Sequence, residues 1–427
     1  MLDESLKERM EAYRVLLQWQ KGGSFIKEAG LSPFAMELAL GVCRRHLFLQ
    51  YFVKTLVKKM PSLEVCTVLE MGLFQMFFTE VPDHAAVATT VELVKAASLG
   101  EGSARFMNAV LHAARKSGLP ALPPQKVRRV SIEKSVPEWL VRRWFDIYGG
   151  TRAEALAKAT LERPVEWIRV NLQKTSAPVL AQKLGITGAS ILYDRYIQVP
   201  ADAKLKPILE SESFAKGEFS MQNPSAYEVV KLLDLKPDLK VWDACAAPGG
   251  KAALMAEMDS SLDILASDVS ETRVLKMHDL VDRLGLTNVR VECRDVLALD
   301  PSTEFTLSLS KGLDATRSSK FDRILLDVPC SNMGVIARRP ESVYRITPES
   351  IKELAELQYN ILKAASTKLA PGGILVYATC SPDPEETTKV VNKFVKENPE
   401  FEKGESVLPG AEDSRYDGFF AQALHRK

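Results

Sequence analysis

The sequence predicts an α/β protein with a doubly wound, Rossmann-like sheet in its carboxyl-terminal half and an all-helical region in front of it. From about residue 214 onward, short apolar runs alternate with helical patterns, which is typical of repeated βα units and a parallel sheet. Residues 239–251, LKVWDACAAPGGK, join one apolar run to a helix through a tight Pro-Gly-Gly turn. Between residues 4 and about 116, apolar residues instead recur at helical spacing.

The bulk composition indicates a globular protein of several domains. The chain has 427 residues, of which 46% are hydrophobic and 26% charged, and this length suggests roughly two to four domains. Charges interrupt the apolar runs well short of the ~20 residues that a membrane span needs. The amino-terminal stretch MLDESLKERMEAYR is a charged amphipathic helix without a signal-peptide core. We therefore expect a cytoplasmic protein with no membrane partner.

The six cysteines form no C-x-x-C pair, so the sequence suggests neither a metal site nor a disulfide framework. They are Cys43, Cys66, Cys245, Cys293, Cys330 and Cys380. This scatter predicts free thiols in a reducing compartment.

The net charge of +1 conceals an asymmetry along the chain. Residues 1–240 hold 33 Lys and Arg against 26 Asp and Glu, whereas residues 241–427 hold 23 against 29. A basic front half would suit an anionic partner such as RNA. A solvated surface of mixed charge explains the same numbers equally well.

Composition shifts predict four segments. Residues 1–118 form a helical bundle, the Pro-rich 119–134 a linker, 135–213 a small α+β segment, and 214–427 the α/β domain. In the third segment, arginines interleave with aromatics, as they would on an RNA-binding surface. Core packing of the tryptophans is the alternative; they are Trp139, Trp144 and Trp167.

Six runs in the α/β domain are predicted strands: 239–244, 263–267, 288–293, 321–327, 373–379 and 418–423. Thr347 and Pro348 begin a helix with one apolar stripe, as an N-cap residue and a first-turn proline do. Residues 301–320, rich in Ser, Thr and Lys, are predicted to be a surface loop.

The glycine turn predicts a nucleotide-type cofactor site. Gly249 and Gly250 allow close approach of a ligand, and the following helix points free N–H groups at it. Lys251 is followed by Ala252 where a P-loop has Ser or Thr, and the spacing is not that of a dinucleotide fingerprint. An ordinary turn explains this segment alone equally well.

Three acidic residues close successive strands and favour the ligand interpretation. Asp268, Asp295 and Asp327 follow the second, third and fourth predicted strands. An acid about 20 residues past the glycine turn suits the hydroxyl groups of an adenosine ribose.

Two cysteines also stand at strand ends. Cys330 lies in Asp-Val-Pro-Cys-Ser and Cys380 in Ala-Thr-Cys-Ser. Either can be a small buried hydrophobe. At the carboxyl end of a strand, however, a thiolate would face the cleft as a nucleophile, and a helix start predicted at Asp383 and Pro384 would stabilise it.

These motifs together resemble the S-adenosylmethionine-dependent RNA cytosine-5 methyltransferases of the Sun type. The resemblance rests on DACAAPGGK, on Asp268 with Arg273, on LLDVPCSNMGV and YATCSPDPEE, and on FAKGEFSMQNPSA before the first strand. In front of them, residues 69–116 resemble the NusB-type RNA-binding bundle at the following positions: Gly72, Pro82, His84 to Val87, Glu92, Phe106 and Asn108 to Leu111.

The resemblance implies a role for each site residue. The amino acid end of S-adenosylmethionine would lie against Cys245, Ala246, Ala247, Pro248, Gly249, Gly250 and Lys251. Asp268 would hold the ribose, Asp295 would lie on the adenine side, and Asp327 would lie between the methionine moiety and the target base. Cys380 would be the nucleophile, and Cys330 would assist its release. By analogy with the family, the NusB-like bundle points to small-subunit rRNA as the partner. We also expect a monomer that holds no metal.

Four positions depart from the usual pattern of that family: Asn223, Ala252, Val328 and the pair Asn332-Met333. None removes a catalytic group, so they affect pocket shape and RNA choice rather than the reaction. Three alternatives stay open: methylation of tRNA or another RNA, a catalytically silent RNA-binding ribosome-assembly factor, and the DNA methyltransferase arrangement, in which the Pro-Cys cysteine, Cys330, is the nucleophile.

Overall fold

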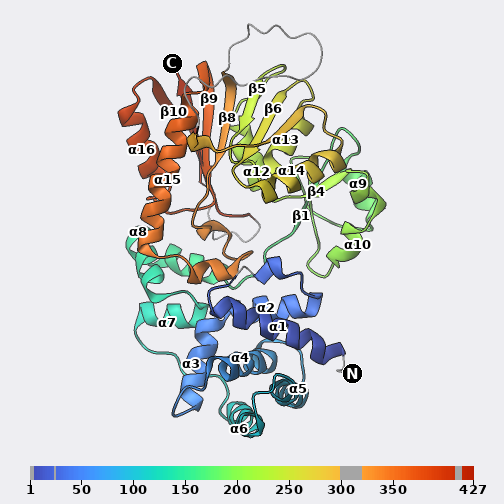
Figure 1. Cartoon of the computed structure of the whole chain (residues 1–427), viewed down its shortest axis with the longest axis vertical. Helices are drawn as coiled ribbons and strands as arrows, with labels where there is room; N and C mark the ends of the chain where they lie inside the picture. Colours follow the sequence, from blue (N-terminus) through green and yellow to red (C-terminus); the bar gives the residue numbers. More distant parts are fainter. Residues whose placement is uncertain (1–3, 24–25, 299–319, 409–415) are drawn as a thin grey trace. The chain divides into compact units, whose positions relative to one another are not determined.

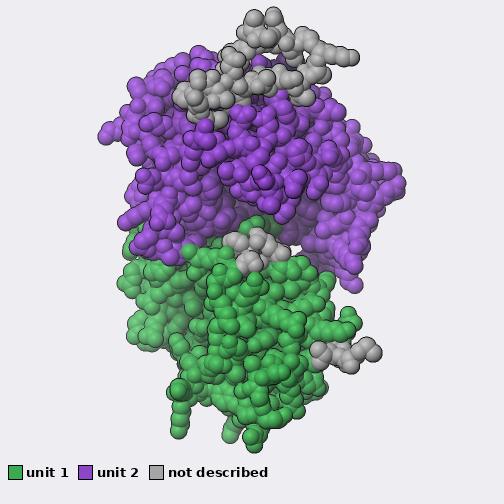
Figure 2. All heavy atoms as spheres, in the orientation of Figure 1, with its two compact units in different colours: residues 1–163, 336–345 green, residues 164–335, 346–427 purple. Residues whose placement is uncertain are grey.

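The computed structural model describes residues 4–23, 26–298, 320–408 and 416–427 (Figure 1). The chain divides into two compact units, coloured separately in Figure 2. Unit 1 comprises Met1–Arg163 and Ile336–Arg345, and unit 2 comprises Pro164–Val335 and Ile346–Lys427. The division at Arg163 lies inside the α+β segment that we predicted at 135–213.

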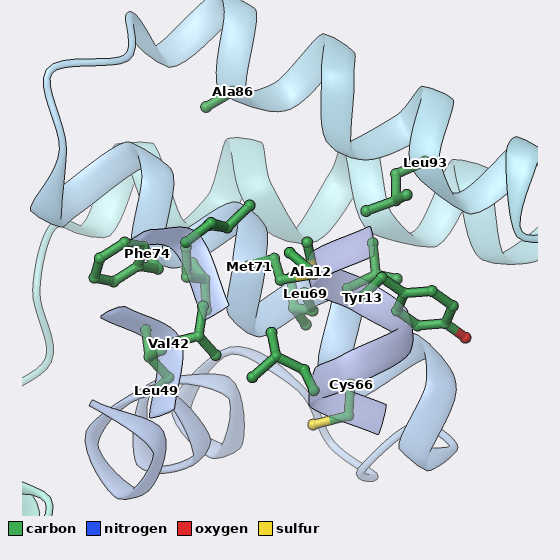
Figure 3. Close-up of a cluster of buried hydrophobic side chains, with 14 of the residues drawn as sticks. Ala12, Tyr13, Val42, Leu49, Cys66, Leu69, Met71, Phe74, Ala86 and Leu93 are labelled. Carbon is green, nitrogen blue, oxygen red and sulfur yellow. The ribbon is translucent and has the colours of Figure 1, made fainter. Parts of the chain in front are cut away.

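Unit 1 is helical, as the spacing of its apolar residues predicts. Ser32 and Ser62 cap α2 and α4, each accepting a backbone N–H with its hydroxyl oxygen. The helices are α1 (Glu4–Gln20), η1 (Ile26–Ala29), α2 (Pro33–Arg44), α3 (His46–Leu56), α4 (Leu63–Phe78), α5 (Asp83–Ala96), α6 (Glu101–Ser117), α7 (Lys126–Lys134) and α8 (Glu138–Ala159). Part of their shared core is shown in Figure 3, where Leu49, Leu69 and Met71 are fully buried.

Unit 1 also contains ten residues from the carboxyl-terminal half of the chain, 336–345. The short helix η4 (Pro340–Tyr344) packs there, and the hydroxyl of Tyr344 donates to the backbone oxygens of Cys43, at 3.1 Å, and Ser135, at 3.0 Å. No local pattern in the sequence predicts this excursion, because it depends on contacts more than 200 residues apart.

Unit 2 begins with a small antiparallel sheet in the order β2-β3-β1-β4. Trp167 in β1 is buried in unit 2 and Trp144 in α8 is buried in unit 1, which favours the core-packing interpretation for both. The elements are β1 (Trp167–Val170), α9 (Ala177–Lys183), β2 (Ile191–Leu192), β3 (Tyr196–Gln198), α10 (Leu205–Leu209), α11 (Glu212–Ala215), β4 (Phe219–Met221) and α12 (Ser225–Lys231).

The main sheet of unit 2 has the order β10-β11-β9-β8-β5-β6-β7 in the described part of the chain, and β7, β6, β5, β8 and β9 run parallel. This confirms the doubly wound α/β prediction. The strands are β5 (Lys240–Asp243), β6 (Asp263–Asp268), β7 (Val289–Cys293), β8 (Phe321–Asp327), β9 (Leu369–Thr379), β10 (Phe401–Val407) and β11 (Phe420–Arg426). The helical turns and helices between them are α13 (Gly250–Met258), α14 (Glu271–Leu284), η2 (Val296–Ala298), η3 (Met333–Val335), α15 (Pro348–Ser366) and α16 (Thr388–Glu397).

Helices cover both faces of the central parallel strands, so buried side chains of these strands point to both sides (Figure 1). Val241 of β5 packs among residues of α12, α13 and α14, whereas its neighbour Trp242 packs among residues of α15 and α16. Thr347 caps α15 in a reciprocal capping box with Ser350, as predicted for its start.

The last two strands differ from the expected all-parallel sheet. β11 pairs antiparallel with β9, and β10 pairs antiparallel with β11. The run FEKGESV of β10 is mostly exposed, and its polar composition gave no strand signal. Except for Lys320, the predicted loop 301–320 lies outside the described residues. Within the described ranges, no helix is both long and apolar enough to cross a membrane.

Candidate active site and family

The predicted glycine turn connects β5 to α13 at the carboxyl end of the central strand. Gly249 has a φ of 99°, a left-handed conformation that strongly favours glycine, and α13 begins at the next residue. A Cβ on Gly250 would lie 2.9 Å from Nε2 of Gln222. The backbone angle therefore favours glycine at position 249, whereas a side chain at position 250 would require the end of Gln222 to move.

A cavity of about 230 Å³ opens beside this turn. The site residues predicted from the sequence that line it are Ala246, Ala247, Pro248, Gly250, Lys251 and Asp327. Asp243, Asn223 and Asp417 complete much of its polar wall. Asn223 is one of the departures from the family pattern, and its side-chain oxygen accepts the backbone N–H of Asp417 at 3.2 Å.

A partly exposed ion pair links the turn to the neighbouring strand β8. The Nζ of Lys251 lies 2.5 Å from Oδ2 of Asp327 at the end of β8. Burial lowers the pKa of Lys251, but attraction to Asp327, Asp243 and Asp417 outweighs it, and the pKa is raised overall. Lys251 therefore stays positively charged at neutral pH.

Asp243, the last residue of β5, is a fully buried carboxyl group. Among the described residues, neither of its oxygens makes a hydrogen bond of ordinary geometry, although the Ala252 amide faces it closely enough to favour the charged form. Burial raises its pKa to about 8, the Lys251 ammonium opposes this rise, and Asp327 and Asp268 add to it. A cation in the cavity would favour ionisation of Asp243.

Arg169 supports the turn from behind and had no sequence signal as a functional residue. Its fully buried guanidinium pairs with Glu257 of α13 through two hydrogen bonds, of 3.0 and 2.7 Å. It also donates to the backbone oxygen of Gly250, at 2.7 Å, and to Oε1 of Gln222, at 2.6 Å. The small sheet therefore holds the first turn of α13 in place.

The other predicted cofactor residues lie at or just after the carboxyl ends of parallel strands. Asp268 ends β6 and is buried, and its Oδ1 contacts Arg273, at 2.9 Å, and the amide of Ser270, at 3.0 Å. Asp295 is exposed after β7 and caps the short helix η2 through the amide of Leu297. Cys245 is half-buried, and burial raises the pKa of its thiol, so it stays protonated.

The two predicted reactive cysteines meet at the ends of neighbouring parallel strands. Cys380 directly follows β9 and Cys330 lies three residues beyond β8, and their Cα atoms are 6.4 Å apart. The structure joins their sulfur atoms in a disulfide. The prediction that every cysteine is a free thiol is therefore wrong for this pair, because only the fold brings together residues 50 positions apart.

Asn332 lies beside Cys380, and the predicted helix start lies just after it. Oδ1 of Asn332 lies 3.2 Å from Sγ of Cys380, close enough to accept the S–H of the reduced thiol, and the Asn332 amide donates to the backbone oxygen of Cys330. Asn332 has a φ of 61°, which Asn tolerates better than most residues. The helix start predicted at Asp383 and Pro384 is wrong, since residues 384–387 form a turn and α16 begins at Thr388.

In the part of the chain that the structure describes, no group of three or more His, Cys, Asp or Glu side chains is arranged to hold a metal ion.

Family models match the chain in three consecutive regions. The model for the NusB family matches residues 7–116, and a ferredoxin-like domain of RsmF/B-like methyltransferases matches residues 136–196. The model for the 16S rRNA methyltransferase RsmB/F matches residues 230–421.

Solved structures share the fold. The crystal structure of PH0851 has a TM-score of 0.76 at 20% identity and covers 98% of this chain and 99% of its own. A methyltransferase homologue from Pyrococcus horikoshii has a TM-score of 0.58 at 25% identity, over 72% of this chain and 100% of its own.

Whole-length relatives are more similar in sequence. The probable ribosomal RNA small subunit methyltransferase B of Bacillus subtilis (strain 168) is 33% identical over 447 residues, which cover 98% of this chain and 96% of the relative. The ribosomal RNA small subunit methyltransferase B of Salmonella arizonae is 31% identical, over 92% of this chain and 90% of its own length. This chain therefore belongs to the RsmB/F family of 16S rRNA methyltransferases.

Proposed function

We propose that this protein transfers a methyl group from S-adenosylmethionine to C5 of a cytosine in small-subunit rRNA, through a covalent bond between Cys380 and C6 of the base. The observation that carries the proposal is the meeting of Cys330 and Cys380 at the ends of β8 and β9, two strands whose carboxyl ends share one edge of the sheet. Family membership supports rRNA methylation in general.

The residues around the turn fit the proposed cofactor. S-adenosylmethionine supplies an electrophilic methyl group on a sulfonium and carries an ammonium group at its amino acid end. The buried carboxyl of Asp243, with its unsatisfied oxygens, suits such a cation, and the glycine turn suits close approach of the backbone. Residues 245–251 would hold the amino acid end, Asp268 the ribose and Asp295 the adenine side.

The chemistry requires an activated base, because C5 of cytosine is a poor nucleophile. The Cys380 thiolate adds to C6, and C5 then bonds to the methyl group, while the electron pair of the broken S–CH₃ bond stays on the sulfur of the donor, which would leave as a neutral thioether. The C5 proton passes to a base, and the C6–S bond breaks with its electron pair returning to Cys380. Cys330 assists this release, and Asp327 lies between the donor and the target base. The target cytosine must be unpaired or flipped out of its helix.

The reaction demands free thiols, so the Cys330–Cys380 disulfide is an inactive form of the site. Activity should appear only in the presence of a thiol reductant. The cytoplasmic location and the monomeric state expected from the sequence stay predictions.

The experiment supplies labelled S-adenosylmethionine to the reduced protein with unmodified small-subunit rRNA, and with tRNA in parallel, followed by digestion to nucleosides. Label in 5-methylcytidine from rRNA alone is the expected result. Label from tRNA would replace the substrate but keep the reaction. No label despite measurable cofactor binding would favour an assembly factor instead.

Two variants separate the roles of the cysteines. Cys380→Ser should abolish transfer, whereas Cys330→Ser should leave a covalent protein–RNA adduct on a denaturing gel. An adduct that forms only with intact Cys330 would reverse the assignment.

A further inference from the structure

A buried polar network lies directly behind the two cysteines. Each cysteine is followed by a serine, and the hydroxyl oxygens of Ser331 and Ser381 are 3.3 Å apart. Both serines are buried, Ser381 completely. The two Cys-Ser steps therefore run alongside each other, with the sulfur atoms in contact on one side and the hydroxyl groups on the other.

The centre of this network is the carboxylate of Glu386, which has no solvent exposure. Its Oε1 accepts the amide N–H of Ser331, at 2.9 Å, and Nε2 of Gln358, at 3.0 Å. Its Oε2 accepts the hydroxyl of Ser331 at 2.5 Å. A carboxylate removed from water is destabilising unless donors satisfy it, and here three donors do so.

Further contacts extend the network to α15 and β9. Gln358 of α15 donates to the backbone oxygen of Pro329 at 2.9 Å, just before Cys330. The Tyr377 hydroxyl of β9 lies 2.6 Å from the backbone oxygen of Glu386 and 3.1 Å from Oε1 of Gln358. The residues on both sides of Cys330 are therefore tied to the segment that follows Cys380.

A backbone contact completes the attachment on the other side of the loop. The amide of Gly334 donates to the carbonyl of Cys380 at 2.8 Å, and a Cβ at Gly334 would collide with the backbone of Gly418. The pairing of β8 with β9 also continues to the amide of Val328, which donates to the backbone oxygen of Ala378 at 3.0 Å. These backbone contacts hold the two segments together, and the Glu386 network adds contacts directly beside both cysteines.

We infer that Glu386 is a positioning residue that sets the spacing between Cys330 and Cys380, and that this spacing determines how quickly the covalent adduct with RNA is released. The inference rests on the proposed function, in which Cys380 bonds to C6 and Cys330 assists the breaking of that bond. Glu386 touches neither sulfur and acts through Ser331.

The test uses Glu386→Gln, which places an amide N–H₂ against donors that need an acceptor. Tyr377→Phe is a milder second variant that removes one hydroxyl from the same network. The matched control is Tyr359→Phe. Tyr359 lies next to Gln358 on α15, and its hydroxyl bonds to Glu397 of α16, outside the network. All three proteins are full-length and are assayed with labelled S-adenosylmethionine and rRNA.

The readout is the ratio of trapped adduct to released methylated RNA, which does not depend on how much of the protein is folded. Weakening a charge-assisted hydrogen bond should raise this ratio about tenfold in Glu386→Gln. The rise should be smaller in Tyr377→Phe and absent in Tyr359→Phe. An unchanged ratio in both network variants, with only a general loss of activity, would overturn the inference.

A second readout does not require methyl transfer. The fraction of Cys330–Cys380 disulfide, measured at fixed ratios of oxidised to reduced glutathione, should fall in Glu386→Gln and match wild type in Tyr359→Phe. If the disulfide fraction falls but the protein transfers no methyl group, Glu386 does set the spacing of the cysteines, while the proposed function and the role in release are refuted. A disulfide fraction equal to that of wild type would refute the positioning role of Glu386.

Discussion

The carboxyl edge of the main sheet contains two fully buried carboxyl groups in contrasting surroundings. Asp243, beside the glycine turn, makes no hydrogen bond of ordinary geometry within the described residues, whereas Glu386, behind the cysteines, accepts three. On the cysteine side, donors of the protein itself thus satisfy the buried carboxylate. The turn side keeps an unsatisfied acceptor whose pKa is raised to about 8. The comparison suggests that one side is preorganised for chemistry and the other is built to receive a cation.

A buried ion pair nevertheless supports the glycine turn from behind. Arg169 and Glu257 form an ion pair with almost no exposure, and Arg169 also holds the carbonyl of Gly250. The unsatisfied oxygens of Asp243 therefore lie above a support in which the Arg169 and Glu257 side chains are hydrogen-bonded.

The largest expected effect comes from breaking that support. Glu257→Gln leaves the Arg169 guanidinium buried without its counter-charge, and should lower the free energy of unfolding by about 3–5 kcal/mol. Urea unfolding of the reduced protein measures it. Glu210→Gln is the control, because its pair with Lys206 is largely exposed and should contribute at most about 1 kcal/mol. Equal losses in the two variants would mean that Arg169 does not depend on Glu257.

The two buried carboxyls should respond to amide substitution with opposite signs. Glu386→Gln removes an acceptor from three donors and should cost about 1–3 kcal/mol of unfolding free energy at neutral pH. Asp243→Asn removes a group that resists ionisation, and should stabilise the protein by on the order of 1–3 kcal/mol at pH 8. A loss of stability in both variants would remove the contrast between the two regions.

The pH dependence of the Asp243 effect follows from its raised pKa. The folded protein binds the Asp243 proton up to a pKa of about 8, whereas the unfolded chain releases it near the ordinary pKa of 3.8. The folded state thus holds more protons between these values, and this group lowers stability as the pH rises through the window. The gain from Asp243→Asn should therefore be small at pH 4 and largest at pH 8. Urea midpoints measured at both pH values test this, and a gain independent of pH would contradict it.

The glycine turn, the strand-end acids and both cysteines could be predicted from the sequence because each depends on residues within a few positions. Arg169 could not, since β1 belongs to a separate small sheet and its partner Glu257 is 88 positions away. Glu386 was visible only as part of a motif, and its role depends on Gln358 and Ser331 from two other elements. The Cys330–Cys380 disulfide and the placement of residues 336–345 in unit 1 depend in the same way on contacts between distant positions.

The smallest expected effect is on the turn side, at the pair formed by Asp268 and Arg273. The Arg273 side chain is 53% exposed, so water screens the pair, and Arg273→Ala should change the free energy of unfolding by at most about 1 kcal/mol. If Asp268 holds the ribose, Asp268→Asn should weaken S-adenosylmethionine binding about tenfold, because a charged acceptor is lost. Arg273→Ala should weaken it much less, since its guanidinium only orients the acceptor. Calorimetric titration of both variants decides the point: equal weakening would mean that the ion pair as a whole, rather than the Asp268 carboxylate, forms the ribose contact.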